Sequence, residues 1–247
     1  MNRDMNKYDY SVHYRRFHDE SETHAYIMAD WLSCVIKSHL NLPKEARILD
    51  VGCGFGFALG ALRKLGYENT LGLELSAEQA DVARKAGHQV IVTEDSIGWL
   101  RSNPEQFDFV VLLDVLEHLP VVIQIDFLRA LHTVLRPGGK VIITVPNANA
   151  ILNARWRYID YTHHSSFTEH SLFFVLRNAG FESIWIDSSK GLGRFSLRFW
   201  RRSFWPSVRR WIVRWCWLQV FKAEIPGQDV DDISFELNLT AVAAKNA

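Results

Sequence analysis

Short apolar runs alternate with amphipathic stretches along most of the chain. Five apolar runs predict buried strands, at residues 47–51, 70–75, 89–93, 107–113 and 140–145. Stretches with helical spacing separate several of these runs, and residues 22–40 show the same spacing ahead of the first run. Strands that alternate with helices of this length are typical of strand–helix–strand units, whose parallel sheet is buried on both faces.

The pattern changes in the last third of the chain. Residues 168–178 predict a helix and residues 181–187 a sixth strand. Residues 233–243 alternate apolar with polar side chains, as a half-buried seventh strand does. Residues 189–230 therefore form an insertion between the last two strands, at a sheet edge. We expect one α/β domain over residues 1–247, with residues 1–43 as an N-terminal helix and lid.

Composition narrows the class of protein. The 247 residues are 48% hydrophobic and 23% charged, which excludes collagenous and wholly disordered chains. The three cysteines (Cys34, Cys53 and Cys216) form no CxxC pair, which favours a reduced, cytoplasmic protein without a structural zinc site. No apolar run approaches the roughly 18 residues of a spanning helix. The polar N-terminus predicts no signal peptide.

Charge is distributed unevenly. The chain has 28 basic and 28 acidic residues, but nine of the basic ones and none of the acidic ones lie between Lys190 and Ala223. Five of the nine tryptophans lie there too. On a helical wheel, Arg209, Arg210 and Arg214 point away from an apolar side, which consists of Val208, Trp211, Ile212, Trp215 and Leu218.

The basic and aromatic side chains of this insertion are compatible with several kinds of binding partner. A helix with an arginine face and a tryptophan face can lie in a membrane interface, so residues 194–222 predict contact with a membrane surface. A homodimer contact or a cover for the sheet edge is the second interpretation. Nucleic acid ranks third, because the acidic remainder of the chain opposes a long polyanion.

A glycine-rich turn, DVGCGFG at residues 50–56, joins the first strand to the next helix. Glycines there let the backbone turn sharply and approach a ligand. Glu74 ends the second strand, where an acidic side chain can bind both hydroxyls of a ribose. A dinucleotide-binding dehydrogenase would show GxGxxG instead, and GCGFGFA is too close to that spacing for the turn alone to decide.

The longer segment ILDVGCGFG resembles the nucleotide-binding signature of class I S-adenosylmethionine-dependent methyltransferases. Residues 107–119, with FDFV and DVLEHL, and the LRPGG turn at residues 135–139 resemble later motifs of that family, in the same order. The resemblance implies a Rossmann-like sheet of seven strands, mostly parallel with an antiparallel last strand, and helices on both faces. The helical insertion lies between strands 6 and 7. It also implies S-adenosylmethionine as the cofactor.

The resemblance assigns the cofactor contacts to the carboxyl ends of the first four strands. These residues are Asp50, Gly52, Cys53, Gly54, Glu74, Leu75, Asp95, Ser96, Leu113 and Asp114. Two residues of the N-terminal lid, Tyr14 and Arg15, are further candidates, because a tyrosine beside an arginine can close over the cofactor and bind its carboxylate.

The acceptor side of the site is predicted from the segment DYTHHSSFT at residues 160–168. It resembles the DxTHxxxFT signature of a subset of these methyltransferases, in which the first histidine faces the acceptor. We therefore expect His163 to be the general base, since imidazole titrates near neutral pH. Asp160 would orient His163, and His118 is a second acceptor-side candidate. Their spacing matches no metal motif, so no metal is expected.

The leading functional hypothesis is O-methylation of a sugar hydroxyl in a surface or lipid-linked glycan. It rests on a looser resemblance to methyltransferases of bacterial polysaccharide pathways. Methylation of a quinone or another small apolar metabolite is the enzymatic alternative. A non-catalytic protein that binds S-adenosylmethionine, or an NAD-dependent oxidoreductase, is the alternative of another class. We expect a cytoplasmic protein that associates with a membrane.

Overall fold

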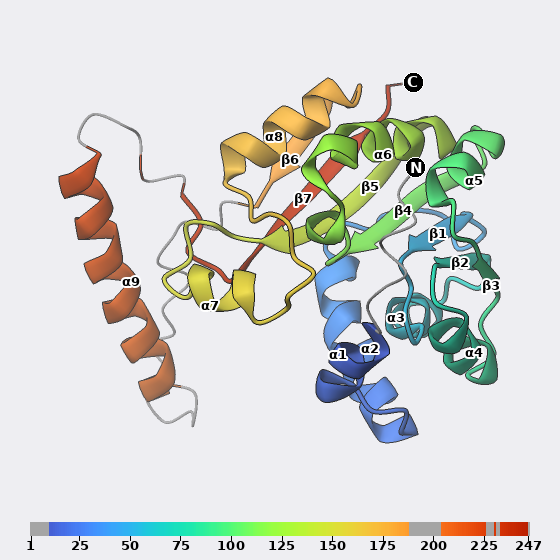
Figure 1. Cartoon of the computed structure of the whole chain (residues 1–247), viewed down its shortest axis with the longest axis horizontal. Helices are drawn as coiled ribbons and strands as arrows, with labels where there is room; N and C mark the ends of the chain where they lie inside the picture. Colours follow the sequence, from blue (N-terminus) through green and yellow to red (C-terminus); the bar gives the residue numbers. More distant parts are fainter. Residues whose placement is uncertain (1–9, 188–203, 226–229, 231–232, 247) are drawn as a thin grey trace.

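A computed structural model describes residues 10–187, 204–225, 230 and 233–246 (Figure 1). A seven-stranded sheet in the order β3-β2-β1-β4-β5-β7-β6 forms its centre. The strands are β1 (Ile48–Val51), β2 (Thr70–Glu74), β3 (Val90–Val92), β4 (Phe107–Leu113), β5 (Leu135–Pro146), β6 (Ser183–Ile186) and β7 (Asn238–Ala244). The first five pair in parallel, and β7 is antiparallel to both β5 and β6. This confirms the predicted fold, including the antiparallel last strand.

Helices cover both faces of the sheet (Figure 1). The helices are α1 (Tyr10–Phe17), α2 (Glu22–Lys37), α3 (Phe57–Lys64), α4 (Ala77–Lys85), α5 (Ser96–Ser102), α6 (Val121–Val134), α7 (Asn153–Tyr158), α8 (Glu169–Asn178) and α9 (Phe204–Glu224), with one 3₁₀ turn at Leu116–His118. Leu100, Leu128 and Leu172 bring α5, α6 and α8 into one buried cluster. Ile36 and Leu62 bring α2 and α3 into a second cluster. Buried apolar side chains on both faces explain why the strands are nearly continuous apolar runs.

Two strands differ from their predicted lengths. Strand β5 begins at Leu135 and not at residue 140, because Leu135 pairs with Phe107 and the N–H of Gly138 donates to Lys245 near the C-terminus. Strand β7 begins only at Asn238, although the alternation starts at residue 233. The backbone before it bonds to side chains instead, since Asn147 donates to the carbonyls of Ser234 and Glu236.

The sheet order places the expected ligand-binding crevice beyond β1 and β4. These strands are neighbours at the point where the strand order reverses, and ligands of open α/β sheets bind outside the carboxyl ends of the strands at such a point. The glycine-rich turn after β1 and the Leu116–His118 turn after β4 both begin at this edge. The fold therefore brings the predicted cofactor and acceptor segments together.

Helix α9 lies at one end of the molecule, beyond α7 and the carboxyl end of β5 (Figure 1). Its orientation differs from the helical wheel. Arg214 is its one fully buried residue and is paired with Glu236, whereas Ile212 and Trp215 are exposed. The wheel was wrong here because it cannot show which groups the body of the protein presents to the helix. The other parts of the predicted insertion lie outside the described residues. The part of the predicted lid before residue 10 lies outside them too. Within the described ranges, none of the helices has the length and apolarity to cross a membrane.

Candidate active site

The glycine-rich turn after β1 has a backbone conformation that needs glycine. Gly52 and Gly54 have φ angles of 73° and 52°, in the left-handed region that side chains disfavour. A Cβ atom on Gly54 would also lie 2.5 Å from the hydroxyl oxygen of Tyr14. Gly54 thus has no side chain of its own where Tyr14 of α1 lies against the turn, and its contact with a ligand stays a prediction.

Glu74 at the end of β2 holds the same turn in place. Its Oε2 accepts a hydrogen bond of 2.8 Å from the N–H of Gly54. Its Oε1 accepts bonds of 2.9 Å from the N–H groups of Leu75 and Ser76. These bonds fix the carboxylate beside the turn, which is the position that the ribose-binding prediction requires.

A second carboxyl group, that of Asp50 in β1, is buried close to Glu74. Burial, and secondly the charge of Glu74, raise the pKa of Asp50 to about 8. Its Oδ2 atom is buried and has no hydrogen-bond partner among the described residues. Buried polar atoms are nearly always paired in proteins, so this oxygen is a group whose partner is expected to be a ligand.

The other predicted cofactor residues surround this centre or lie beside it. Cys53 is buried in the turn, and burial raises the pKa of its thiol, as expected for a packing residue. Leu75 is exposed after β2. Asp95 caps α5 by accepting from the N–H of Gly98 at 2.9 Å, and Ser96 is the first residue of that helix.

At the end of β4, Leu113 and Asp114 lead into the acceptor side. Asp114 has a φ of 54°, and its Oδ1 accepts hydrogen bonds from the Thr144 hydroxyl and the Asn238 amide, both at 2.9 Å. These bonds connect β4 with β5 and β7. The contacts of Leu113, Asp114 and the other residues above with the cofactor stay predictions.

The acceptor-side residues meet beyond the Leu116–His118 turn. The Nδ1 atom of His118 is 2.8 Å from the Thr162 hydroxyl oxygen. The same hydroxyl donates to Oδ1 of Asp160 at 2.7 Å. The imidazoles of His118 and His163 are in edge contact, with their centroids 4.6 Å apart. Residues 45 positions apart in the sequence, His118 and His163, thus lie side by side, and their roles toward the acceptor stay predictions.

Backbone contacts hold the two segments of this centre together. The N–H of His164 donates to the carbonyl of Glu117 at 2.7 Å. The Gln124 amide donates to the carbonyls of Leu116 and Leu119 and to the Ser165 hydroxyl. The loop that carries His163 is therefore attached to the turn that carries His118.

Burial sets the charge of these histidines. Burial, together with the neighbouring His163, lowers the pKa of His118 to about 4. Burial also lowers the pKa of His163, although Asp160 opposes the shift. Both imidazoles are consequently neutral at pH 7, the form in which a histidine accepts a proton. The Nδ1 atom of His163 is buried and lacks a hydrogen-bond partner among the described residues.

Asp160 has more partners than the prediction gave it. Its Oδ2 atom lies 4.0 Å from Nε2 of His163, beyond hydrogen-bonding distance, but 3.0 Å from Nε2 of His13 in α1. Burial opposes ionisation of Asp160, but hydrogen bonds from Thr162 outweigh it and lower the pKa of Asp160. An ionised carboxylate at this position stabilises any positive charge that develops on the neighbouring imidazoles.

Sequence reasoning missed His13 and Thr162. A single histidine in a polar leader has no spacing signal, and only the fold brings it to a loop almost 150 residues away. Thr162 lies inside the DxTH motif, so its position contained the signal. The lid residues that were predicted lie nearby. Tyr14 packs against Phe55 of the glycine-rich turn, with a centroid distance of 4.8 Å.

Arg15 makes different contacts from Tyr14. Its guanidinium pairs with Glu20 and with Glu78 of α4, on the exposed side of α1. The predicted contact of Arg15 with the cofactor carboxylate stays a prediction.

Three groups in the acceptor centre could hold a metal ion. One ligand atom each from Glu117, His118 and His163 lies within 4.8 Å of the others. Glu117 is buried, and burial together with Asp114 raises its pKa well above the usual range. Spacing rules could not find this set, because His163 is contributed by a separate loop.

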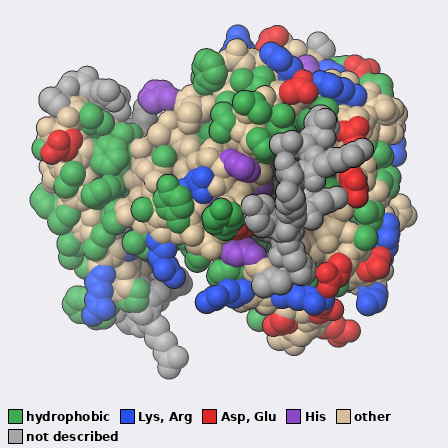
Figure 2. Space-filling view, viewed as in Figure 1, with side chains coloured by type: hydrophobic (Ala, Val, Ile, Leu, Met, Phe, Trp, Pro, Cys, Tyr) green, Lys and Arg blue, Asp and Glu red, His purple; other side chains and the backbone are tan. Residues whose placement is uncertain are grey.

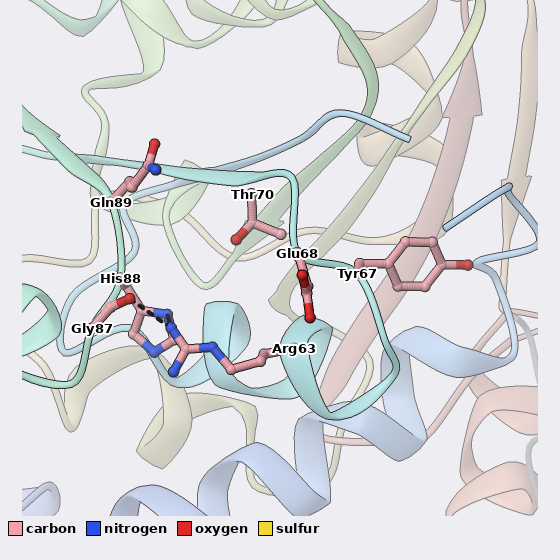
Figure 3. Close-up of a pocket in the computed structure, with 7 residues that line it drawn as sticks. All are labelled: Arg63, Tyr67, Glu68, Thr70, Gly87, His88 and Gln89. Atoms are coloured by element: carbon pink, nitrogen blue, oxygen red, sulfur yellow. Dashed lines mark hydrogen bonds between the residues drawn. The ribbon is translucent and has the colours of Figure 1, made fainter. Parts of the chain in front are cut away.

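A small pocket of about 210 Å³ lies elsewhere, at the amino ends of β2 and β3 (Figure 3). Arg63 and His88 meet at its edge, 3.1 Å apart, and Arg63 also donates to the carbonyls of Ala86 and Gly87. These bonds connect α3 to the turn before β3. The pocket is at the edge of the sheet opposite to the crevice, so we assign it no part in the site.

Comparison with known proteins places these features in context. Residues 22–185 match the family described as "Methyltransferase domain". The ubiquinone biosynthesis O-methyltransferase of Ruegeria pomeroyi is 34% identical over 153 residues, which are 56% of this chain and 60% of that protein. The protein of the same name from Aeromonas salmonicida is 33% identical over 111 residues, 42% of this chain and 44% of its own length. The chain thus spans less than two thirds of these relatives.

Solved structures share the fold. A SAM-dependent methyltransferase from Archaeoglobus fulgidus superimposes with a TM-score of 0.67 at 19% identity, over 96% of this chain and all of that one. A methyltransferase from Thermotoga maritima, described as a possible histamine N-methyltransferase, gives a TM-score of 0.61 at 16% identity, over 96% and 97% of the two chains. Likeness at these identities concerns the fold alone.

Proposed function

The chain belongs to the class I S-adenosylmethionine-dependent methyltransferases, and from this premise we propose that it methylates a hydroxyl group on a small aromatic metabolite of the quinone type. S-adenosylmethionine is its cofactor and supplies an activated methyl group. The proposal concerns the acceptor and the groups that act on it.

One observation carries the proposal: two neutral, weakly basic imidazoles meet at the acceptor side, those of His118 and His163. A base whose pKa is lowered drives proton transfer less strongly, so it needs an acceptor hydroxyl that is itself more acidic. A phenolic hydroxyl ionises near pH 10 and is far more acidic than a sugar hydroxyl. A histidine whose pKa is lowered by burial is therefore better matched to an aromatic hydroxyl.

The curated relatives support the same acceptor class. Both are named for O-methylation in ubiquinone biosynthesis, which agrees with the quinone alternative and not with the sugar hypothesis that the sequence favoured. Support for a sugar acceptor remains the looser resemblance to polysaccharide enzymes. We therefore place the aromatic hydroxyl first.

In the proposed reaction, His163 accepts the hydroxyl proton on an imidazole nitrogen as the acceptor oxygen bonds to the methyl carbon. S-adenosylmethionine would supply this methyl group, and its sulfur would leave with the electron pair of the broken bond. Asp160, 4.0 Å from His163, stabilises the imidazolium that forms. His118 and Thr162 hold the carboxylate in place. Alignment of donor and acceptor accounts for the rest of the catalysis.

The cofactor side fits its group. Gly54 has no side chain, its N–H group holds the Glu74 carboxylate beside the turn, and the Oδ2 atom of Asp50 has no partner among the described residues. We propose that Glu74 binds the ribose hydroxyls and that the buried Asp50 helps to orient the methionine part.

A comparison of acceptors tests this function. The protein is incubated with methyl-labelled S-adenosylmethionine and either a catechol or a monosaccharide such as glucose or rhamnose, and the labelled product is identified by mass spectrometry. We expect label on the catechol oxygen, with rates at least about tenfold above those for the sugars. Label on the sugars alone would refute the aromatic acceptor and restore the glycan hypothesis, and label on a carbon of the catechol would refute O-methylation.

A further inference from the structure

Helix α9 exposes an apolar stripe along its outer side. Trp205 is 68% exposed, Val213 51% and Ile212 49%, and Val220, about two turns after Val213, continues the stripe. Figure 2 shows hydrophobic side chains gathered over this end of the molecule, with basic side chains near one end of the helix. Isolated exposed apolar residues are common, but a row of them along one helix marks an interaction surface.

The opposite side of α9 is fixed to the protein, which defines the direction of the stripe. Arg214 pairs with Glu236 at 2.7 Å. The indole N–H of Trp217 donates to the carbonyl of Asn149 at 3.0 Å, and Phe221 packs against Phe235 with centroids 5.4 Å apart. Since these contacts lie on the inner side, Trp205, Ile212 and Val213 face away from the domain.

The basic residues of α9 indicate which kind of partner binds this surface. Arg209, Arg210 and Lys222 are exposed on α9, and Glu224 in its last turn is the one acidic residue of the helix. The rest of the chain outside residues 190–223 has a net charge of −9. An anionic bilayer offers negative headgroups for the arginines and an apolar layer for the tryptophan and the aliphatic stripe. An acidic protein surface would satisfy only the arginines.

We propose that α9 binds an anionic membrane surface, with its axis in the membrane plane and the Trp205–Ile212–Val213 side in the headgroup region. Trp217 connects α9 to Asn149, which begins the segment that carries Asp160 and His163. Docking would therefore bring the acceptor loop next to the bilayer. The proposal rests on the helix alone and holds whichever acceptor the enzyme uses.

Vesicle sedimentation tests it. The full-length protein is mixed with vesicles of 30% phosphatidylglycerol and 70% phosphatidylcholine, or of phosphatidylcholine alone, at 50 and 500 mM NaCl. We expect binding to the anionic vesicles that decreases at high salt. At about 1 kcal/mol for each basic residue, the double variant Arg209→Glu/Arg210→Glu should lower the partition coefficient at least about 25-fold. Ile212→Asp should lower it through the apolar stripe.

A matched control uses Lys85→Glu/Arg129→Glu, two exposed basic residues on α4 and α6. It changes the net charge equally and should leave vesicle binding within about twofold of the parent. S-adenosylmethionine binding, measured by calorimetry, should be the same for all variants and shows that they fold. Failure of the parent to bind, or equal losses in α9 variant and control, would refute the proposal. A dimer that Ile212→Asp dissociates, without vesicle binding, would refute it in favour of a second copy.

Discussion

At the scale of single residues, Glu74 is the group on which the cofactor side depends. Its carboxylate accepts three backbone hydrogen bonds, from Gly54, Leu75 and Ser76. It therefore shapes the glycine-rich turn before any ligand arrives, and it lies where we propose that the ribose binds. Because Glu74 has both roles, we expect even a replacement side chain of the same size to weaken cofactor binding.

Replacing Glu74 with Gln should weaken S-adenosylmethionine binding by about 10- to 100-fold. This is the range of hydrogen bonds to a charged group, about 1.5–3 kcal/mol, and the amide also brings an N–H group against backbone N–H groups. Titration calorimetry measures the change. Glu68→Gln is the control, because Glu68 is exposed and lies near the amino end of β2, at the opposite edge of the sheet. An unchanged Kd for Glu74→Gln would place the ribose elsewhere.

The positions of several candidate site residues could be predicted from the sequence because each lies within a short motif, whereas their contacts with cofactor and acceptor stay predictions. The glycine-rich turn, Glu74 at the end of its strand, and His163 inside DxTH are examples. The partner of Asp160 could not be predicted. The sequence suggested that Asp160 orients His163, whereas the structure places Oδ2 closer to His13, at 3.0 Å. That contact depends on how a helix at the N-terminus crosses the finished domain.

At the scale of elements, α1 connects the two halves of the site. Tyr14 lies over the glycine-rich turn, and His13, its neighbour in sequence, reaches Asp160 in the acceptor loop. Consecutive residues of one short helix thus contact the cofactor side and the acceptor side. We infer that α1 positions the two sides relative to each other.

His13→Ala should therefore lower kcat/KM for the acceptor by about 10-fold or more, in line with the loss of one hydrogen bond to a charged group. The Kd of S-adenosylmethionine should change little, because His13 contacts the acceptor loop. Tyr14→Phe is the matched variant and should show the reverse, with weaker cofactor binding and a smaller effect on the acceptor. Steady-state kinetics and calorimetry separate the two. Equal effects of both variants on both parameters would show that α1 only stabilises the fold.

The ends of a helix could be predicted from the sequence where the residues that fix them are neighbours in the sequence. Thr168 caps α8 as expected, with Ser171 completing a reciprocal capping box. Helix α1 was not expected, since its eight residues include the adjacent charged residues Arg15 and Arg16 and only a short apolar face. The orientation of α9 was predicted wrongly, because Glu236 and Asn149, which fix it, are far away in the sequence.

At the scale of the whole molecule, the sheet was predictable and the arrangement around it only in part. Alternating apolar runs and glycine-rich turns were enough for a parallel sheet, and the resemblance supplied its antiparallel strand. The reversal of strand order between β1 and β4 then brings the cofactor turn and the histidine centre to one edge. The central claim that follows is that His163 removes the proton of an aromatic hydroxyl in this crevice.

The most direct measurement is kcat/KM of the parent and of His163→Ala with phenols of graded acidity, at pH 8. We predict a loss of roughly 100- to 10,000-fold for a phenol that ionises near pH 10. The loss should shrink to nearly none for a nitrophenol that is already ionised, because such an acceptor needs no base. For the weakly acidic phenol, the acid limb of the parent's pH profile should lie below the ordinary histidine value of about 6.5, since burial lowers the pKa of His163. An equal loss across all phenols, or no loss with any of them, would contradict the assignment of His163 as the base.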